Sequence, residues 1–246
     1  MDDHVSDTKP LSHYEYAAVH DHQPKTLLVA NFNAAKEAAR AEEVRKQAQE
    51  YMMQLEGWCS ELKSNTLIDL VLKVKPSIIV EIGVWGGKSL IPMACALRAN
   101  GKGTIFGIDP WDNSASIDDL SEEVNVQFWK WADHEGIMRG LVNKIEQFGL
   151  RKQIILIKST SEDASIIPGI EILHIDGNHS KKASMHDVKK WVPLMKSGGW
   201  IVFDDMTWTE NGMPTTAHAV EWLDQNCIRI AVFKDIYCVW GLWVKP

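Results

Sequence analysis

The chain has 246 residues, of which 45% are hydrophobic and 24% are charged. A chain of this length can bury roughly three quarters of its unfolded surface, so one globular core forms without disulfide or metal cross-links. No apolar run approaches the roughly 20 residues of a membrane span, and the amino terminus is polar. The net charge of −7 argues against nucleic acid as a partner. The four scattered cysteines show no CxxC or zinc-type spacing, which favours reduced thiols and a cytoplasmic protein.

The amino-terminal part is expected to contain a polar arm followed by a helix. Residues 1–33 are polar and show no helical or strand periodicity, which predicts a flexible arm. Residues 34–65 are predicted as a helical extension, because apolar side chains recur at helical spacing from Val44 through Ala48 to Leu55. So narrow an apolar stripe docks on the same domain or on a second copy of the chain. A homo-oligomer through this helix is therefore one expectation.

Residues 66–246 are expected to form the main domain, in which apolar runs of strand length alternate with amphipathic stretches of helical length. The strand-like runs are residues 77–82, 104–108, 153–157, 170–175, 200–203, 229–233 and 237–244. The helix-like stretches are residues 64–74, 88–99, 126–148, 180–196 and 214–226. This alternation predicts an α/β fold with a Rossmann-like, doubly wound, mostly parallel seven-stranded sheet. Only residues 234–236 separate the last two runs, so the sheet is expected to end in an antiparallel hairpin.

A glycine-rich segment, EIGVWGGKS from Glu81 to Ser89, follows the first strand and begins a helix. Glycines such as Gly83 and Gly87 let the backbone approach a ligand, and the start of the helix offers unpaired N–H groups. The dinucleotide fingerprint GxGxxG is not matched, because Trp85 stands at its second glycine, and the Walker spacing also fails. A carboxylate at the strand end favours a ligand that presents a cation or an amine over a phosphate. A plain strand-to-helix turn is the alternative.

A second motif, GIDPW, ends the next strand and contains Asp109 and Trp111. An aspartate at this point can accept hydrogen bonds from both hydroxyls of a ribose. The indole of Trp111 can cover an adenine face or close a substrate cleft. A simple Asp-Pro turn at the end of a strand is the alternative.

Carboxylates also follow two later strands, as Asp176 in DGNH and as the pair Asp204 and Asp205. If these strands are neighbours, the three carboxylates converge and require a cation or a proton. An all-oxygen set favours a hard ion such as Mg²⁺, Mn²⁺ or Ca²⁺ over zinc. His179 lies three residues beyond Asp176 and could take a proton from a substrate held by that metal. His174 is interpreted as a structural strand histidine, and a solvated turn is the alternative for the aspartate pair.

In the order and spacing of these motifs, residues 66–244 resemble the class I S-adenosylmethionine-dependent methyltransferases. More narrowly, they resemble the metal-dependent O-methyltransferases, which include catechol-type enzymes and the sugar methyltransferases of macrolide biosynthesis. The pattern acidic–x–Gly–x–x–x–Gly–x–Ser is similar to the methionine-end loop of that family. DGxH at 176–179 and GGxxVFDD at 198–205 are closer to the macrolide-sugar branch. The expected hairpin agrees, since the methyltransferase sheet ends with an antiparallel strand.

The resemblance implies S-adenosylmethionine as methyl donor and Mg²⁺ as the expected divalent cation. It implies cofactor contacts from Glu81, Gly83, Trp85, Gly87, Ser89, Asp109, Trp111 and Ser161. It implies Asp176, Asp204 and Asp205 as metal ligands, with His179 and Asp176 as catalytic residues. The lysine that catechol-type members place between their metal ligands has no clear counterpart in this sequence.

The expected reaction is methyl transfer to a hydroxyl of a small molecule. The stretch 112–131 contains Trp129 and Trp131, whose stacked indoles would suit a sugar or polyol, whereas an acidic loop with inward-packed tryptophans is the alternative. The arm 1–33 and the loop 206–213 would complete the acceptor pocket. A nicotinamide-dependent oxidoreductase is disfavoured, because no tyrosine begins a Tyr-x-x-x-Lys motif and the tyrosines are expected outside the cleft. A non-catalytic cofactor-binding or assembly protein on the same fold is the alternative function.

Overall fold

The computed structural model describes the backbone of residues 25–246 and the side chains of residues 33–246. Residues 1–24 of the expected arm lie outside this part, and helix α1 begins at Lys25 and ends at Met52. The chain divides into two compact units, Met1–Ala38 and Ala39–Pro246. All of the strands described below lie in the second unit. The association of two copies through the amino-terminal helix stays a prediction.

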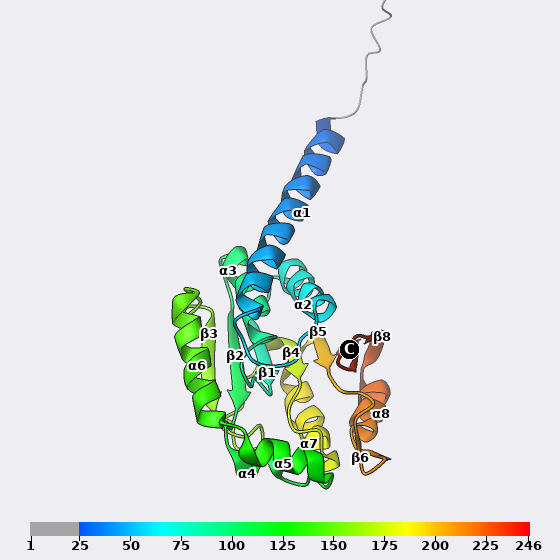
Figure 1. Ribbon diagram of the computed structural model, residues 1–246. Coiled ribbons are helices and arrows are strands. Elements are labelled where there is room, and N and C mark those ends of the chain that lie inside the picture. Colours follow the sequence, from blue (N-terminus) through cyan, green and yellow to red (C-terminus); the bar gives the residue numbers. More distant parts are fainter. Residues whose placement is uncertain (1–24) are drawn as a thin grey trace, which may run out of the picture. The chain divides into compact units, whose positions relative to one another are not determined.

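Seven strands form one sheet in the order β3-β2-β1-β4-β5-β9-β8 (Figure 1). Neighbours from β3 to β5 pair in parallel, whereas β9 is antiparallel to both β5 and β8. This arrangement confirms the predicted mostly parallel sheet with a terminal antiparallel hairpin. The strands are β1 (Ile78–Ile82), β2 (Thr104–Asp109), β3 (Ile154–Lys158), β4 (Ile170–Ile175), β5 (Met195–Phe203), β8 (Ile228–Lys234) and β9 (Val239–Val244). A separate two-stranded ribbon consists of β6 (Thr209–Glu210) and β7 (Met213–Pro214).

Both faces of the sheet are covered by helices. Neighbouring residues of a strand point to opposite faces, and each face contributes to its own buried apolar cluster. Ile79 of β1 belongs to one buried apolar cluster and Val80 to the other. The first cluster includes residues of α2 (Glu61–Val74), α3 (Leu90–Asn100) and α6 (His134–Gln147). The second includes residues of α7 (Lys181–Trp191), the 3₁₀ turn η1 (Val192–Leu194) and α8 (Ala217–Asn226). Burial on two faces explains why the strands read as unbroken apolar runs.

Several helix boundaries differ from those expected. Residues 25–33, expected in the flexible arm, belong to α1, which ends at Met52 rather than continuing to residue 65. The stretch 126–148 is not one helix but α5 (Glu123–Trp131) followed by α6, because the side chain of Asp133 accepts the N–H of Gly136 at 2.9 Å and caps a new helix start. The short α4 (Asn113–Ile117) and α5 lie beside the carboxyl end of β2 (Figure 1). The expected division between residues 65 and 66 falls inside α2, which is a single helix of the compact unit.

Two further features bear on the expected setting of the protein. Among the helices of the described residues, none is both long and apolar enough to cross a bilayer. All four cysteines are free thiols, and only Cys238 is more than slightly exposed.

Candidate active site

The carboxyl ends of β1, β2, β4 and β5 meet at one edge of the sheet, where a cavity of about 950 Å³ opens. This is the edge at which open α/β sheets bind their ligands. Nine of the residues singled out in the sequence line this one cavity. They are Gly83, Trp85, Ser89, Asp109, Ser161, Asp176, His179, Asp204 and Asp205.

Three residues that were expected to contact the cofactor do not line the cavity. Trp111 is 3% exposed, and its indole N–H donates to the carbonyl of Trp85 at 2.9 Å. It therefore supports the glycine-rich segment from the protein interior. Gly87 faces the side chain of Leu141. Glu81 is fully buried at the end of β1, because its carboxylate turns into the protein rather than toward the cavity.

The Glu81 carboxylate belongs to a buried polar chain. Its Oε1 accepts the hydroxyl of Ser89 and faces Nδ1 of His174 at 3.0 Å. Burial raises the pKa of Glu81 to about 8, although the Ser89 hydrogen bond and the charge of Lys63 act in the opposite direction. Its Oε2 is buried without a hydrogen-bond partner, and such an atom is a position that a ligand amine could satisfy.

Asp109 organises the glycine-rich loop as well as lining the cavity. Its Oδ2 accepts the N–H groups of Val84 and Trp85, each at 2.9 Å, and its Oδ1 accepts the N–H of Trp111 at 2.7 Å. Trp85 has a φ of +49°, which is uncommon for a residue with a side chain, so this carboxylate holds a strained turn in place. Burial raises the pKa of Asp109 despite the three N–H groups, which lower it.

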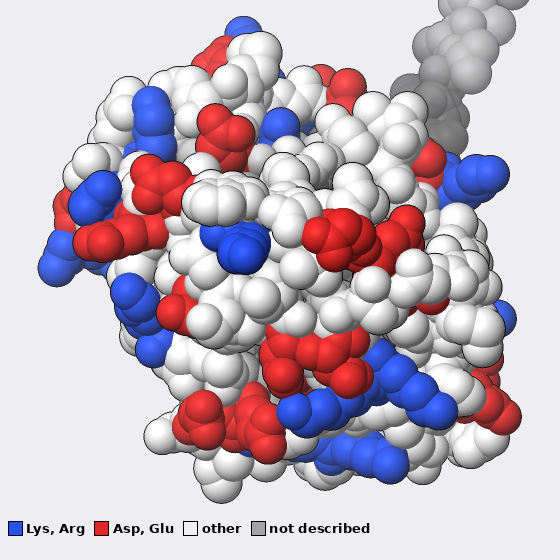
Figure 2. Space-filling view, turned by 60° about the horizontal axis from the view of Figure 1, so that its bottom comes forward, with Lys and Arg blue, Asp and Glu red and all other residues white. Residues whose placement is uncertain are grey.

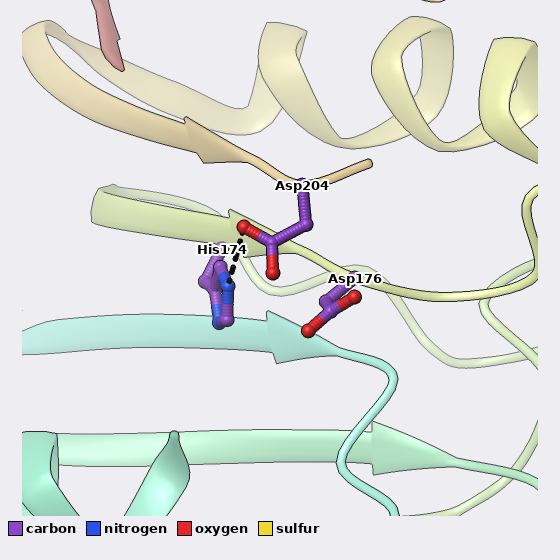
Figure 3. Close-up of side chains that lie close together, drawn as sticks. All are labelled: His174, Asp176 and Asp204. Atoms are coloured by element: carbon purple, nitrogen blue, oxygen red, sulfur yellow. Dashed lines mark ion pairs between the residues drawn. The ribbon is translucent and has the colours of Figure 1, made fainter. Parts of the chain in front are cut away.

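The second half of the site lies at the ends of β4 and β5, which pair so that Ile175 stands beside Phe203. Asp176 and Asp204 point toward one another there, with His174 beside them (Figure 3). Nε2 of His174 lies 3.6 Å from Oδ1 of Asp204. Burial lowers the pKa of His174 to about 3, so its imidazole is neutral at ordinary pH. The histidine that sequence interpretation left out of the site thus stands between Glu81 and Asp204.

A lysine that sequence interpretation missed also contacts this half of the site. The Lys63 side chain, 2% exposed, extends from the first turn of α2 to the aspartates. Its Nζ lies 3.3 Å from Oδ2 of Asp176 and forms an ion pair with Oδ2 of Asp204. Burial is the largest effect and acts to lower the pKa of Lys63, but the charges of Asp176, Cys59 and Cys238 and the hydrogen bond to Asp176 together hold the pKa above its ordinary value.

His179 and Asp205 form an ion pair on the cavity wall, with Nε2 and Oδ2 separated by 3.1 Å. Burial acts to lower the pKa of His179. The hydrogen bond to Asp205 and the charges of Asp205 and Asp176 together act more strongly in the opposite direction, so the pKa lies above its usual value. The imidazole packs against the ring of Trp208, with centroids 4.8 Å apart. The hydroxyl of Thr215 donates to the backbone carbonyl of His179 at 2.7 Å. The imidazole ring is thus positioned by Asp205 and Trp208, and the backbone of His179 is held by Thr215.

The carboxylates fit a divalent cation, although not as the single three-carboxylate group that was expected. Among the described residues they fall into two groups that share Asp176, one with Asp204 and His174 and the other with Asp205 and His179. Within each group the potential ligand atoms lie within 4.8 Å of one another. Oδ1 of Asp204 is buried and has no hydrogen-bond partner, and a cation would satisfy it.

Two insertions expected at the acceptor pocket, 112–131 and 206–213, are joined by the buried carboxylate of Glu210. It accepts the backbone N–H groups of Ser121 and Glu122 at 3.0 and 2.6 Å. It also accepts the side-chain amide of Asn125 at 2.8 Å and the indole N–H of Trp208 at 2.9 Å. Because Trp208 packs on His179, this clamp connects the acceptor-side wall with the histidine.

The aromatic wall of the cavity differs from the expected pair of indoles. Trp129 lines the cavity and packs edge-on against Trp85 and Trp58, with ring centroids 5.2 and 6.2 Å apart. Trp131 is 76% exposed and does not line the cavity, because its side chain bonds to Gln127 on the outer face of α5. Tyr237 does line the cavity, so the expectation that all tyrosines lie outside the cleft is wrong.

The cavity wall after β3, where Ser161 was expected to contact the cofactor, also contains an acid that sequence interpretation missed. Thr160 and Ser161 line the cavity after β3, and the hydroxyl of Ser161 donates to Asp187. Burial raises the pKa of Asp187 to about 7, against the opposing effect of this hydrogen bond. A sequence signal existed: Asp187 lies four residues before the buried Trp191 on α7, so both side chains point to the same, inward face of the helix.

The sequence and the fold were compared with those of known proteins. A family described as a methyltransferase domain matches residues 80–206, about half of the chain. The chain belongs to this methyltransferase-domain family. The uncharacterized protein R132 of Acanthamoeba polyphaga mimivirus is 29% identical over 162 residues, which are 65% of this chain and 66% of that protein. A caffeoyl-CoA O-methyltransferase of Stellaria longipes is 22% identical over 201 residues, 82% of this chain and 75% of that enzyme.

The fold resembles that of an O-methyltransferase from Bacillus cereus solved in complex with SAH. The TM-score is 0.56 and the identity 17%, and the match covers 84% of this chain and 91% of that chain. The family match and the Stellaria relative confirm the expected class, an S-adenosylmethionine-dependent O-methyltransferase. The likeness to the Bacillus cereus structure confirms the Rossmann-like fold.

Proposed function

We propose that this protein transfers the methyl group of S-adenosylmethionine to a hydroxyl of a small, uncharged acceptor such as a sugar or polyol. His179 would be the base, and a divalent cation, Mg²⁺, would assist. One observation carries this proposal. A single cavity has the Gly83–Asp109 loop wall and the His179–Asp205 pair among its lining residues, so donor and acceptor sites are continuous. Holding two reactants in one such site can contribute on the order of 7–11 kcal/mol to catalysis.

The donor end would be built by the residues at the ends of β1 and β2. When bound, S-adenosylmethionine supplies an electrophilic methyl group on a sulfonium ion. Asp109 would accept a ribose hydroxyl at Oδ1, because three backbone N–H groups occupy all but about one of its four lone-pair sites. Gly83 lets the backbone approach the donor, whereas Glu81 would act from behind the loop by holding the hydroxyl of Ser89, which lines the cavity. Ser161 would contact the adenine side.

The acceptor end would use His179 as general base. With Nε2 turned to Asp205, Nδ1 is the nitrogen left to accept the proton of an acceptor hydroxyl. Asp205 fixes the imidazole orientation and stabilises the imidazolium that forms. Trp208 and the carbonyl contact from Thr215 prevent the ring from turning away.

The divalent cation would be held by Asp176 and Asp204, whose oxygens suit a hard ion, whereas Asp205 lies in the second group with His179. When bound, it would lower the pKa of an acceptor hydroxyl and so ease proton removal. Asp176 has the central place among these ligands because it belongs to both groups of potential ligand atoms.

The walls around the acceptor end support an uncharged acceptor. Trp58, Phe128 and Trp129 offer apolar faces, whereas Ser114 offers a hydroxyl for hydrogen bonding. Figure 2, in which the bottom of Figure 1 is turned forward, shows acidic and basic side chains interspersed over this face. A surface of mixed sign does not favour a strongly charged acceptor of either sign.

Replacing Asp109 with asparagine is expected to raise the Kd for S-adenosylmethionine by about tenfold or more, because the charged acceptor of a ribose hydrogen bond is lost. Isothermal titration calorimetry measures this change. Asp112→Asn, in which an exposed helix cap is altered on the same loop, is the control and should leave the Kd within about twofold. An unchanged Kd for the Asp109 variant would place the ribose elsewhere.

The proposed function is tested by calorimetry with S-adenosylmethionine, with and without Mg²⁺, followed by a screen of hydroxylated acceptors with labelled methyl donor. Donor binding and Mg²⁺-stimulated labelling of a sugar or polyol are expected. Absence of donor binding would contradict the enzymatic function and favour a non-catalytic protein. Transfer that is unaffected by Mg²⁺ and by chelators would contradict only the role of the metal.

A further inference from the structure

Lys63 is the one cationic side chain that contacts both Asp176 and Asp204 in the described part of the chain. The lysine and Asp204 side chains are each 2% exposed. Burying a carboxylate without a counter-charge is costly, and the nearest histidine nitrogen, Nε2 of His174, lies 3.6 Å from Asp204, farther than the Lys63 ammonium. The ammonium therefore supplies the positive charge that this buried pair needs in the protein as it stands.

The position of Lys63 is fixed by the start of its helix. The hydroxyl of Ser60 accepts the backbone N–H of Lys63 at 3.1 Å and donates to Asp235 at 2.6 Å. Asp235 in turn accepts the indole N–H of Trp240 on β9 at 3.1 Å. The first turn of α2 is thus attached to the terminal hairpin of the sheet, and the lysine is held against the aspartates rather than tethered loosely.

We propose that Lys63 is the resident cation of the Asp176–Asp204 pair, which it stabilises in the metal-free protein and for which it competes with a divalent ion. The inference deepens the metal part of the proposed function and rests on that site. A divalent ion on Asp176 and Asp204 would lie within a few ångströms of the ammonium and be repelled by it. Lys63 is accordingly a residue that tunes metal affinity downward, and a positioning residue for the two carboxylates.

The test compares wild-type protein with Lys63→Met, a substitution that removes the charge and keeps an unbranched side chain. In EDTA the midpoint of thermal unfolding should fall by roughly 10 °C, because the buried Asp204 and the partly buried Asp176 lose their cation. In calorimetry with Mn²⁺ alone, the variant should bind at least about tenfold more tightly than wild type, because a repulsive charge is gone. Mn²⁺ should therefore restore the stability of the variant more than that of wild type.

Two further variants make the result specific. Lys73→Met removes an exposed lysine from the same helix and should match wild type in both measurements. The double variant Lys63→Met, Asp204→Asn removes both charges of the ion pair. It should regain most of the stability lost in EDTA and lose the gain in Mn²⁺ affinity.

The proposal is overturned if Lys63→Met is as stable as wild type in EDTA, or if it binds Mn²⁺ no more tightly. Should Lys63→Met fail to fold, the double variant decides: a folded double variant in EDTA supports the inference, and an unfolded one overturns it. None of these measurements contains methyl donor or acceptor. Failure of wild type to bind S-adenosylmethionine would thus contradict the proposed function alone.

Discussion

Replacement of His179 by alanine is expected to lower turnover by about 10²–10⁴-fold, the usual contribution of a positioned general base. The Kd for S-adenosylmethionine should stay nearly unchanged, because the donor end is built from the ends of β1 and β2. A histidine base works only when neutral, so wild-type turnover should rise with pH through one ionisation, and the variant should lose that rise. Turnover against pH at saturating Mg²⁺, for both proteins, measures this difference.

The matched control is His218→Ala, which removes an exposed histidine from α8 and should leave turnover unchanged. A structural histidine would behave differently from a base. If His179 only shapes the Asp176 turn, its removal would lower thermal stability and metal affinity while the pH profile kept its wild-type form. A variant that retains more than about a tenth of the activity with an unshifted profile would exclude His179 as base and leave Asp176 as the next candidate.

Replacement of Gly83 by alanine is expected to destabilise the fold by about 3 kcal/mol or more. Gly83 has a φ of +82°, and a Cβ placed there would lie 1.9 Å from the backbone oxygen of Asp176. The contact cannot be relieved by a side-chain rotation, because both partners are backbone. Chemical denaturation monitored by tryptophan fluorescence measures the change in the free energy of unfolding.

Gly101→Ala separates strain from collision in this experiment. Gly101 has a φ of +69°, but a Cβ there would meet no atom within 4 Å. Its substitution should cost only the left-handed backbone conformation, about 1–2 kcal/mol. If Gly83→Ala costs no more than Gly101→Ala, then the ends of β1 and β4 are not packed as closely as described.

The mostly parallel sheet could be predicted because burial on both faces imposes unbroken apolar runs on its strands, and the hairpin because a three-residue connection is too short for a parallel crossover. The break between α5 and α6 could not, since it depends on the Asp133 side chain bonding to a backbone N–H three residues away. That local hydrogen bond competes with a continuous apolar periodicity, and periodicity alone does not show which prevails.

The carboxylates could be predicted as neighbours, but their pairing could not. Asp204 and Asp205 are consecutive in sequence, and Asp205 has a φ of +49°, so their side chains turn to different partners. Lys63 was missed because its partners are 113 and more residues distant. Its spacing from the buried Leu67, four residues on, was a usable signal, since a lysine on the apolar stripe of a helix needs a buried counter-charge.

The clamp formed by Glu210 has a consequence for how acceptor choice diverges among relatives. Glu210 belongs to the insertion 206–213, whereas three of the four groups that donate to its carboxylate belong to the insertion 112–131. Grafting either insertion alone from a relative would leave a buried acid without donors, or donors without an acid. We therefore expect a change of acceptor specificity to keep the fold stable only when the two segments are exchanged or mutated together.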